Sequence, residues 1–311
     1  MTPQDLAKAT FALVLLRQVR LTPGKTSATI LAAPSEVWAA GQHALDWYNE
    51  HHAKDVRLDQ NDWDQAQKVI DSTVRLNIVP LAIGEALYPS YLANIQDAPP
   101  VLYVKGNLSA LDVKAGVAIV GTRKASINGL TIAERIARFF AENNWTVVSG
   151  LAMGIDAAAH RGALAGQGVT IAVLAHGLRS ASPRVNAALG EEILDQGGAW
   201  VSEYPVDVNA RPEQFVQRNR IQIGLSAGSI IVEGEERSGT MTQAEFCLRN
   251  KRRLFAVLPE RADELKLVSQ GPLILINKRG ATPLRSKYDY EKAMLAMEPL
   301  RNVSIQQQIK D

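Results

Sequence analysis

Short apolar runs rich in β-branched residues alternate with helical stretches from Gly116 onward, and this alternation constrains the fold more than any other feature of the sequence. We expect strands at residues 117–120, 146–149, 170–174, 200–202, 229–232, 254–257 and 273–276. Because the runs are almost continuously apolar, both faces of the strands should be covered, and the helices between them favour parallel pairing. The sequence therefore predicts an α/β protein with an extended Rossmann-like, mostly parallel sheet and helices on both faces.

The chain ahead of this region has a helical texture. Leu6, Ala9, Leu13 and Leu16 recur at helical spacing, and a second helical pattern runs through residues 63–74. We therefore expect a small helical N-terminal domain over residues 1–80, a Rossmann-like domain over 81–285, and a C-terminal helix and tail over 286–311. The apolar run at residues 9–16 is too short to cross a bilayer and is typical of a buried helix, so we expect neither a membrane span nor a signal peptide.

Composition narrows the class of protein without naming a partner. The 311 residues include 34 Lys and Arg against 32 Asp and Glu, a net charge of +2, so a nucleic-acid surface would have to come from local clustering of charge. Cys247 is the single cysteine, which excludes an intrachain disulfide and favours the cytoplasm. The five histidines show no ligand spacing, so we expect no metal site.

The first of these strands is followed by a turn suited to phosphate. Its candidate binding residues are Gly121, Thr122, Arg123, Lys124 and Ser126. Glycine lets backbone N–H groups approach an anion, the start of the next helix carries partial positive charge, and arginine can hold a phosphate with two hydrogen bonds. A tight strand-to-helix turn with solvated basic side chains would give the same string of residues, so that alternative stays open at this point.

The second strand ends in another glycine-rich loop. Its candidates are Ser149, Gly150, Ala152, Gly154, Asp156 and His160. Parallel strands place their carboxyl ends at one edge of a sheet, so the two loops should be neighbours, and two neighbouring anion-binding loops suit a polyphosphate or a nucleic-acid backbone. For Asp156 and His160 we favour structural roles, as a helix N-cap and a packing histidine, over catalysis.

Two later segments add candidates at the same edge. They contribute Phe215, Arg218, Asn219 and Arg220, and then Ser238, Gly239 and Thr240. Arginines two residues apart on a helix point in different directions, so only one of them need face a ligand. Phe215 is either a stacking platform for a base or part of the core.

Cofactor-binding motifs are incomplete. The dinucleotide fingerprint requires a second glycine where this chain has Arg123, and an acidic residue where the second strand ends in Ser149 and Gly150. Residues 24–26, Gly-Lys-Thr, match the end of a Walker A loop, but Val19 stands at the place of its first glycine. We expect no bound cofactor.

Taken in order, these segments resemble the DNA-processing protein A family, also called DprA or Smf. The matching stretches are PPVLYVKG at 99–106, VGTR at 120–123, SGLAMGIDAAAHRGAL at 149–164, SEYP at 202–205, FVQRNRIQIGLS at 215–226 and VEGEERSGT at 232–240. They are distributed over roughly two thirds of the chain, and an ordered series of this kind is far more specific than any one glycine loop.

The resemblance implies an extended Rossmann domain that binds single-stranded DNA in a basic pocket, forms a homodimer, and hands the DNA to a RecA-type recombinase, as in natural transformation. It also implies phosphate contact by Arg123, a pocket lined by Ser149, Gly150 and Gly154, and added charge from Arg218 and Arg220. Such a pocket binds with little sequence preference and loses affinity steeply as salt rises. We expect a non-enzymatic recombination mediator.

A second hypothesis belongs to a different class of protein. Residues 239–245 end in Glu245 and are similar to the lysine-decarboxylase-like branch of the superfamily, which hydrolyses nucleotides. The protein would then be a nucleotide-binding sensor or an N-glycosidic hydrolase in phage defence, with Glu245 as general acid and base. A Glu245 side chain that points into the pocket favours the enzyme, and one that points to solvent or into an ion pair favours the mediator.

Overall fold

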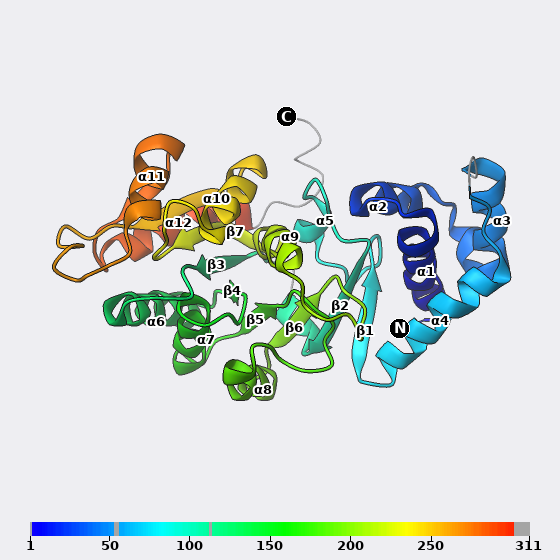
Figure 1. Ribbon diagram of the computed structural model, residues 1–311, viewed down its shortest axis with the longest axis horizontal. Helices are drawn as coiled ribbons and strands as arrows, with labels where there is room; N and C mark the ends of the chain where they lie inside the picture. Colours follow the sequence, from blue (N-terminus) through cyan, green and yellow to red (C-terminus); the bar gives the residue numbers. More distant parts are fainter. Residues whose placement is uncertain (1, 53–55, 112–113, 302–311) are drawn as a thin grey trace.

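The computed structural model describes residues 2–52, 56–111 and 114–301, and within these ranges a nine-stranded sheet runs in the order β1-β2-β6-β5-β4-β3-β7-β8-β9 (Figure 1). The strands are β1 (Ile78–Ala82), β2 (Val101–Gly106), β3 (Gly116–Val120), β4 (Val147–Ser149), β5 (Thr170–Val173), β6 (Ala199–Ser202), β7 (Ser226–Ile231), β8 (Arg253–Val257) and β9 (Thr282–Leu284). Strand β2 pairs antiparallel with β1 and with β6, and the other neighbours pair in parallel. The expected mostly parallel sheet is confirmed.

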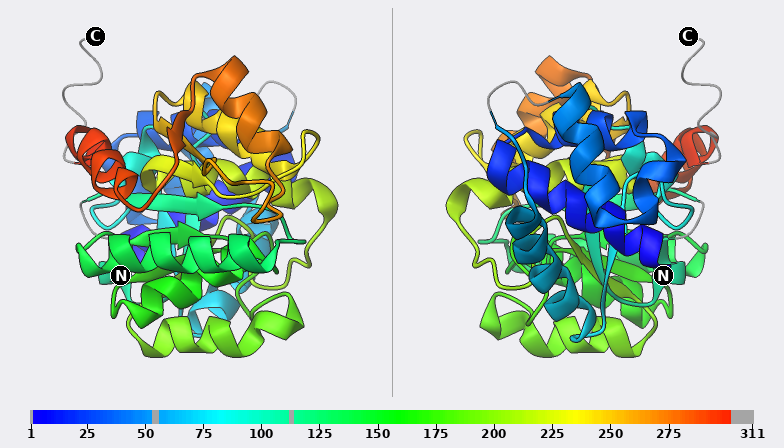
Figure 2. Two further views of the ribbon diagram at one scale, coloured as in Figure 1. Left: turned by 90° about the vertical axis from the view of Figure 1, so that its left-hand side faces the viewer. Right: turned by 90° about the vertical axis from the view of Figure 1, so that its right-hand side faces the viewer.

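Helices cover both faces of this sheet, as expected (Figures 1 and 2). One face carries α6 (Ile127–Glu142), α7 (Ile155–Ala165) and α8 (Ala187–Asp195), and the other carries α9 (Pro212–Gly224), α10 (Gly239–Arg249) and α11 (Gln270–Arg279). The short α5 (Ser90–Ala93) precedes β2, and α12 (Asp289–Arg301) packs against β7 and β8. Short 3-10 turns span Leu108–Leu111 and Arg184–Asn186. No helix in the described ranges is both long and apolar enough to cross a bilayer.

The N-terminal region is helical, as expected, and it packs on the edge of the sheet. It contains α1 (Pro3–Val14), a π-helical turn (Leu15–Val19), α2 (Pro23–Ala32), a 3-10 turn (Ser35–Ala39), α3 (Gly41–His51) and α4 (Gln60–Val74). Helices α1 and α4 lie against β1, and one continuous apolar cluster joins these helices to strands β2, β5 and β6. The domain boundary expected at residue 80 falls inside β1. At the other end, α12 lies in the expected C-terminal helix, and the tail at 302–311 lies outside the described residues.

One strand prediction is wrong. Residues 273–276 belong to α11, in which Leu275 is buried but Leu273 is 41% exposed, so the run does not lie between two layers. The helix ends at Arg279 and is followed by Gly280, whose φ of 72° is left-handed, as is common after a helix C-terminus. A four-residue apolar run fits a helix as well as a strand, and here the strand follows as β9.

The order of the strands creates a crevice at the carboxyl edge of the sheet. Strand β3 lies between β4 and β7. The chain leaves β3 and β4 into α6 and α7 on one face, and leaves β7 into α10 on the other face (Figure 1). Open α/β sheets bind ligands at such a switch point, because the two connections diverge there and leave a gap between them.

Candidate nucleic-acid interface

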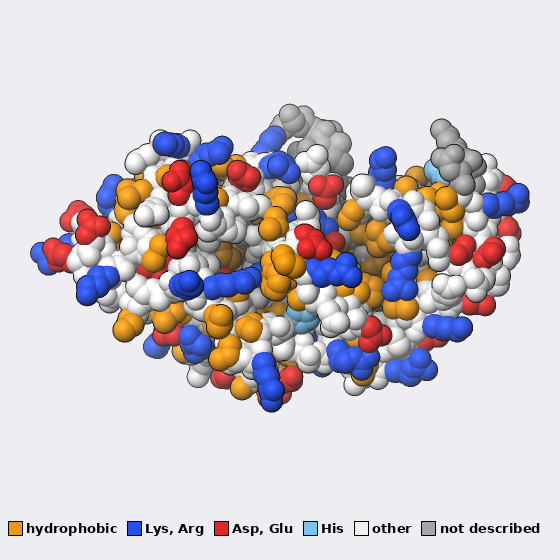
Figure 3. Space-filling view, in the orientation of Figure 1, with side chains coloured by type: hydrophobic (Ala, Val, Ile, Leu, Met, Phe, Trp, Pro, Cys, Tyr) orange, Lys and Arg blue, Asp and Glu red, His pale blue; other side chains and the backbone are white. Residues whose placement is uncertain are grey.

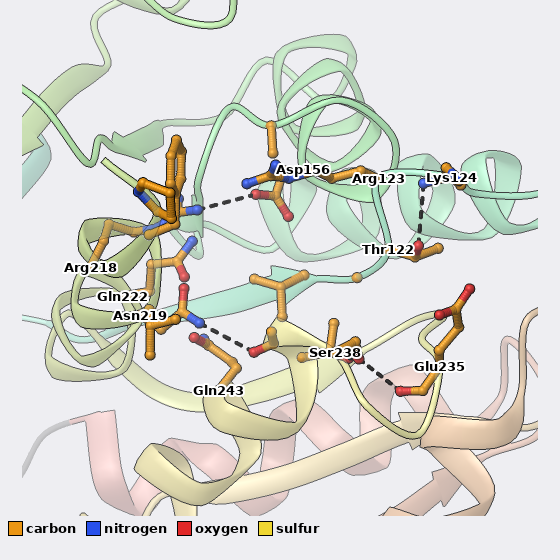
Figure 4. A pocket seen from close by; sticks show the side chains of 18 residues that line it. Thr122, Arg123, Lys124, Asp156, Arg218, Asn219, Gln222, Glu235, Ser238 and Gln243 are labelled. Carbon is orange, nitrogen blue, oxygen red and sulfur yellow. Dashed lines mark hydrogen bonds and ion pairs between the residues drawn. The ribbon is translucent and has the colours of Figure 1, made fainter. Parts of the chain in front are cut away.

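A pocket of about 570 Å³ opens at this switch point (Figure 4). The turns after β3, β4 and β7 line it together with one face of α9 and the start of α10, through Val120, Gly121, Thr122, Arg123, Lys124, Ala152, Asp156, Pro212, Phe215, Val216, Arg218, Asn219, Gln222, Glu235, Ser238, Gly239, Thr240 and Gln243. Segments far apart in the sequence therefore meet at one edge of the sheet, where sequence analysis placed them.

The mouth of the pocket is formed by a cation and an aromatic ring. Arg123 is exposed, and none of the ion pairs among the described residues involves it. Its guanidinium carbon lies 4.9 Å from the centroid of the half-buried Phe215 ring. Lys124 is also exposed beside it. Figure 3 shows a hollow on this face of the molecule that is bordered by both basic and hydrophobic side chains. Positive charge and an aromatic surface therefore border the same opening.

A buried ion pair lies deeper in the pocket. The Arg218 Nη1 donates to the carbonyl oxygen of Val173 at 2.8 Å, and Nη2 lies 3.9 Å from the Asp156 Oδ2. Burial lowers the pKa of Arg218 and raises that of Asp156, and the attraction between the two groups opposes both shifts. Gly150 makes room for the guanidinium, since a Cβ there would lie 1.5 Å from Nη1. Gly150 thus acts behind the pocket wall and does not line it.

The wall between α9 and α10 consists of side-chain amides. Asn219 and Gln222 come from α9, and Gln243 comes from α10. The hydrogen-bond network orients Gln222 so that its oxygen accepts from the Gly150 N–H at 3.0 Å, while its nitrogen donates to Asn219 Oδ1 and Gln243 Oε1, each at 3.2 Å. Neither glutamine was predicted from the sequence. Gln222 carried a signal, because it follows Arg218 and Asn219 at the spacing of one helix face.

The turn before α10 supplies hydroxyl groups that are already engaged with one another. Ser238 Oγ donates to the carbonyl oxygen of Glu235 at 2.7 Å and lies 2.5 Å from Thr240 Oγ1. The carbonyl oxygen of Gly239 accepts from Asn219 Nδ2 at 3.2 Å. The Asn219–Gly239 hydrogen bond joins this turn to α9, and the other two contacts lie within the turn.

The N-terminus of α6 does not face the pocket, which corrects the expectation for Ser126. The Glu233 carboxylate is fully buried and accepts from Ser126 N at 3.0 Å, from Ser126 Oγ at 2.8 Å and from Val268 N at 2.8 Å. A carboxylate of the protein thus occupies the place expected for phosphate. Glu233 was not predicted, because nothing in the sequence connects a glutamate after β7 with a turn after β3.

Arg220 also lies outside the pocket, contrary to the expectation that it adds charge there. It is buried and forms two hydrogen bonds of 2.6 Å with the Glu203 carboxylate, and its Nε donates to the carbonyl oxygen of Asp97 at 2.8 Å. The pair joins α9 to the end of β6 and to the segment before β2. Of the two arginines on α9, Arg218 alone is placed to meet a ligand in this pocket.

His160 and Ser149 support the loop after β4 from behind, so the structure does not bring them into the pocket. His160 is fully buried, with Nδ1 2.7 Å from Thr170 Oγ1 and Nε2 accepting from the Leu151 N–H at 3.3 Å. Burial lowers its pKa to about 3, which keeps the ring neutral at physiological pH. Ser149 Oγ donates to the carbonyl oxygen of Ile119 at 2.7 Å. The structural role favoured for His160 agrees with these contacts.

The start of α7 differs from the expectation that Asp156 is its N-cap. Gly154 is the N-cap, with a φ of 80°, and Asp156 lies in the first helical turn. A Cβ at Gly154 would lie 2.3 Å from the carbonyl oxygen of Thr122, so this glycine permits close contact between the two loops instead of lining the pocket. Asp156 is therefore free of the N-cap role and turns toward Arg218 (Figure 4).

Glu245 is not among the residues that line the pocket. Its side chain is exposed, and its Oε1 lies 3.9 Å from Arg279 Nη2. By the criterion set out above, this direction favours the mediator over the hydrolase. Within residues 2–52, 56–111 and 114–301, no group of three or more His, Cys, Asp or Glu side chains could hold a metal ion.

An open, mostly parallel sheet with a partly basic pocket at its switch point defines a Rossmann-like α/β protein. The sequence profile described as DNA recombination-mediator protein A matches residues 80–294. The chain belongs to this family.

Relatives of known name support the assignment. Protein Smf of Escherichia coli (strain K12) is 44% identical over 174 residues, which cover 55% of this chain and 45% of that protein. DNA processing protein DprA of Bacillus subtilis (strain 168) is 34% identical over 201 residues, covering 63% of this chain and 67% of that protein. The match thus spans less than half the length of the E. coli relative.

Two solved structures have the same fold. DNA processing protein A from Streptococcus pneumoniae superposes with a TM-score of 0.67 at 28% identity, covering 94% of this chain and 98% of that one. DNA processing protein A from Helicobacter pylori, solved to describe its binding of single-stranded DNA, superposes with a TM-score of 0.62 at 30% identity, covering 70% of this chain and 96% of that one.

Proposed function

We propose that this protein binds single-stranded DNA in the pocket at the switch point and acts as a non-enzymatic recombination mediator. One observation carries the proposal: the Arg123 guanidinium lies over the Phe215 ring at the mouth of the pocket, and Arg218 lines the same pocket. Arg123 is exposed and has no ion-pair partner among the described residues. A single strand offers a charged backbone and exposed bases together, and this opening offers a partner for each.

The cations and the aromatic ring at the mouth would contact different groups of a single strand. Arg123 and Lys124 stand at the exposed rim, where they can neutralise phosphates and release the counterions that surround them. Phe215 offers a ring against which a base can stack with little regard to sequence. In duplex DNA the bases are already paired and stacked, so we expect a strong preference for single strands.

The relatives supply the biological setting of the proposal. The family is described as a recombination mediator, and the H. pylori relative binds single-stranded DNA. We extend both properties to this chain, together with a recombinase that receives the DNA and a second copy of the chain that completes a homodimer. A role in natural transformation belongs to the same proposal.

A titration of labelled oligonucleotides tests the DNA-binding step. We expect the protein to bind a single strand far more tightly than the duplex of the same sequence. Raising the salt from about 50 to about 200 mM should weaken binding by about sevenfold to twentyfold if two or three phosphates are contacted. Equal affinity for single strand and duplex, or an affinity that salt does not change, would contradict the proposal.

A further inference from the structure

We infer that a single strand held in the pocket continues along the carboxyl edge of the sheet to the N-terminal helices, where Arg17, Arg20 and Lys25 bind its phosphates. The inference rests on the proposed function, because it extends the path of the same strand beyond the pocket. It gives a DNA-binding role to the N-terminal region, none of whose residues lines the pocket.

The charges of the N-terminal region are separated along the sequence. Residues 6–35, which cover most of α1, the π-helical turn and α2, contain four Lys or Arg and no Asp or Glu. Residues 36–75, which include α3 and α4, contain eight Asp or Glu against four Lys or Arg. Figure 3 shows basic side chains over α1 and α2, and acidic ones further out, toward α3. Such a local surface of one sign attracts a partner of the opposite charge.

Three of the four cations in residues 6–35 are available to such a partner. Arg17, Arg20 and Lys25 are exposed, and none of the ion pairs among the described residues involves them. They lie in the short segment that joins α1 to α2. The fourth cation, Lys8, already faces the Trp38 ring, with Nζ 5.9 Å from the ring centroid. Unpaired cations grouped in this way suit successive phosphates of one strand.

Contacts of α2 place this segment at the edge of the sheet where the pocket opens. Strand β2 runs antiparallel to β6, so the residues before β2 lie at the carboxyl edge of the parallel strands. Ser27 Oγ on α2 donates to the carbonyl oxygen of Ala98 at 3.0 Å. Arg220 Nε on α9 donates to the carbonyl oxygen of Asp97 at 2.8 Å. The segment before β2 thus connects α2 with the helix that lines the pocket.

The phosphates belong at the three side chains and not at the N-terminus of α2. A Cβ at Gly24 would lie 3.2 Å from Asp97 Oδ1, so a carboxylate already borders that terminus. Arginine and lysine carry their charge at the end of a long stem, which can hold a phosphate away from this carboxylate. The inference therefore depends on the charges of Arg17, Arg20 and Lys25.

The distance between the two sites suits a strand of moderate length. In the order of the sheet, five strand spacings separate β3, which precedes Arg123, from β1, on which the N-terminal helices pack. At about 4.8 Å per spacing this is about 24 Å. About seven nucleotides cover it at a rise of about 3.4 Å per nucleotide. A strand of about 16 nucleotides can therefore occupy both sites, whereas the pocket holds a strand of about 4 nucleotides out of reach of the second.

The test compares labelled oligothymidylates of about 4 and about 16 nucleotides. We expect the variant Arg17→Gln/Arg20→Gln/Lys25→Gln to bind the longer strand at least about tenfold more weakly than wild type does. Its logarithmic salt slope should fall by about two, because three phosphates of a single strand lose their partners. The shorter strand should bind the variant and wild type equally.

A matched control removes the same number and kinds of charge elsewhere in the N-terminal region. Arg57, Lys68 and Arg75 are exposed and lie on or beside α4. Arg57→Gln/Lys68→Gln/Arg75→Gln changes the net charge by the same amount and should bind both strands as wild type does. Equal losses in the two triple variants would show an effect of net charge and overturn the inference.

The outcomes separate this inference from the proposed function. Unchanged binding of the longer strand by the Arg17/Arg20/Lys25 variant overturns the inference and leaves binding in the pocket intact. Equal weakening of both strands also overturns it, because the charges would then act on the pocket. If wild type binds neither strand, both proposals fall. A longer strand with photoreactive bases gives a second measurement: we expect crosslinks to residues 17–25 as well as to the pocket, and their absence from 17–25 overturns the path even where the shorter strand binds too weakly to titrate.

Discussion

The Arg123 guanidinium lies over the Phe215 ring, 4.9 Å from guanidinium carbon to ring centroid, although the two residues come from opposite sides of the sheet. Arg123 follows β3 in the turn that leads to α6, and Phe215 lies near the start of α9. Their contact closes the rim of the pocket and orients the cation before any ligand arrives. In the proposed binding mode the ring and the charge contact the same strand.

Replacing Phe215 tests the stacking half of this surface. We expect Phe215→Ala to weaken the binding of a single strand by about tenfold or more, because one base loses its stacking partner. Phe215→Tyr keeps the ring and should bind nearly as wild type does. Anisotropy titration of both variants measures the effect. An Ala variant that binds like wild type would show that the ring only packs.

Two glycines of the site provide a matched pair for a packing test. A Cβ at Gly150 would lie 1.5 Å from Arg218 Nη1, whereas one at Gly239 meets nothing within 4 Å. We therefore expect Gly150→Ala to displace Arg218, lower the melting temperature by several degrees and weaken DNA binding. Gly239→Ala should change the free energy of unfolding by less than about 0.5 kcal/mol. Similar melting temperatures for the two variants would argue against the tight packing behind the wall.

The Arg220–Glu203 pair has a structural role, and its removal should show in stability. Both partners are buried, with side-chain exposures of 4% and 10%. Arg220→Met leaves the Glu203 carboxylate buried alone, so we expect the free energy of unfolding to fall by about 3–5 kcal/mol. The double variant Arg220→Met/Glu203→Leu should recover most of this loss. Chemical denaturation of the single and double variants decides the matter, and additive losses would speak against a coupled pair.

His160 makes stability depend on pH. Its pKa falls from 6.5 in the unfolded chain to about 3 in the folded protein. Between these two pH values the ring is protonated in the unfolded state and neutral in the folded state. Its contribution is present in full above pH 6.5 and is lost as the pH falls from there toward 3. Between pH 7.5 and pH 5 the loss should be about 2 kcal/mol.

His160→Gln lacks the titrating ring and serves as the comparison for this effect. Its free energy of unfolding should fall less steeply over the same range of pH, because only the other titrating groups remain. Parallel denaturation curves at four pH values give both slopes. Equal slopes for wild type and variant would show that His160 titrates normally.

The strands of the sheet were largely predictable, since a covered parallel strand needs an uninterrupted apolar run and a turn on each side. Both wrong predictions concern segments that this criterion does not describe. Residues 273–276 satisfy the apolar criterion within a helix, one of whose faces is exposed. Strand β1 was missed because Pro80 lies inside it, and proline is tolerated there because β1 is the edge of the sheet.

The turns of the site were predictable, but the partners of individual side chains were not. Glycines and hydroxyl residues after strands mark a ligand edge locally. Whether Arg218 or Arg220 faces the pocket depends on Glu203, which belongs to another strand end. The closure of the α6 terminus by Glu233 is likewise a contact between distant segments. Sequence spacing carries no information on such pairs.

The most direct test of the central claim is the affinity of Arg123→Ala for a labelled single strand at two salt concentrations. We expect a loss of at least about tenfold at low salt and a shallower dependence of the binding constant on salt, reduced by about one in the logarithmic slope. Arg138→Ala, at an exposed arginine on the second half of α6, should match wild type in both respects. Wild-type affinity and slope in Arg123→Ala would contradict the account.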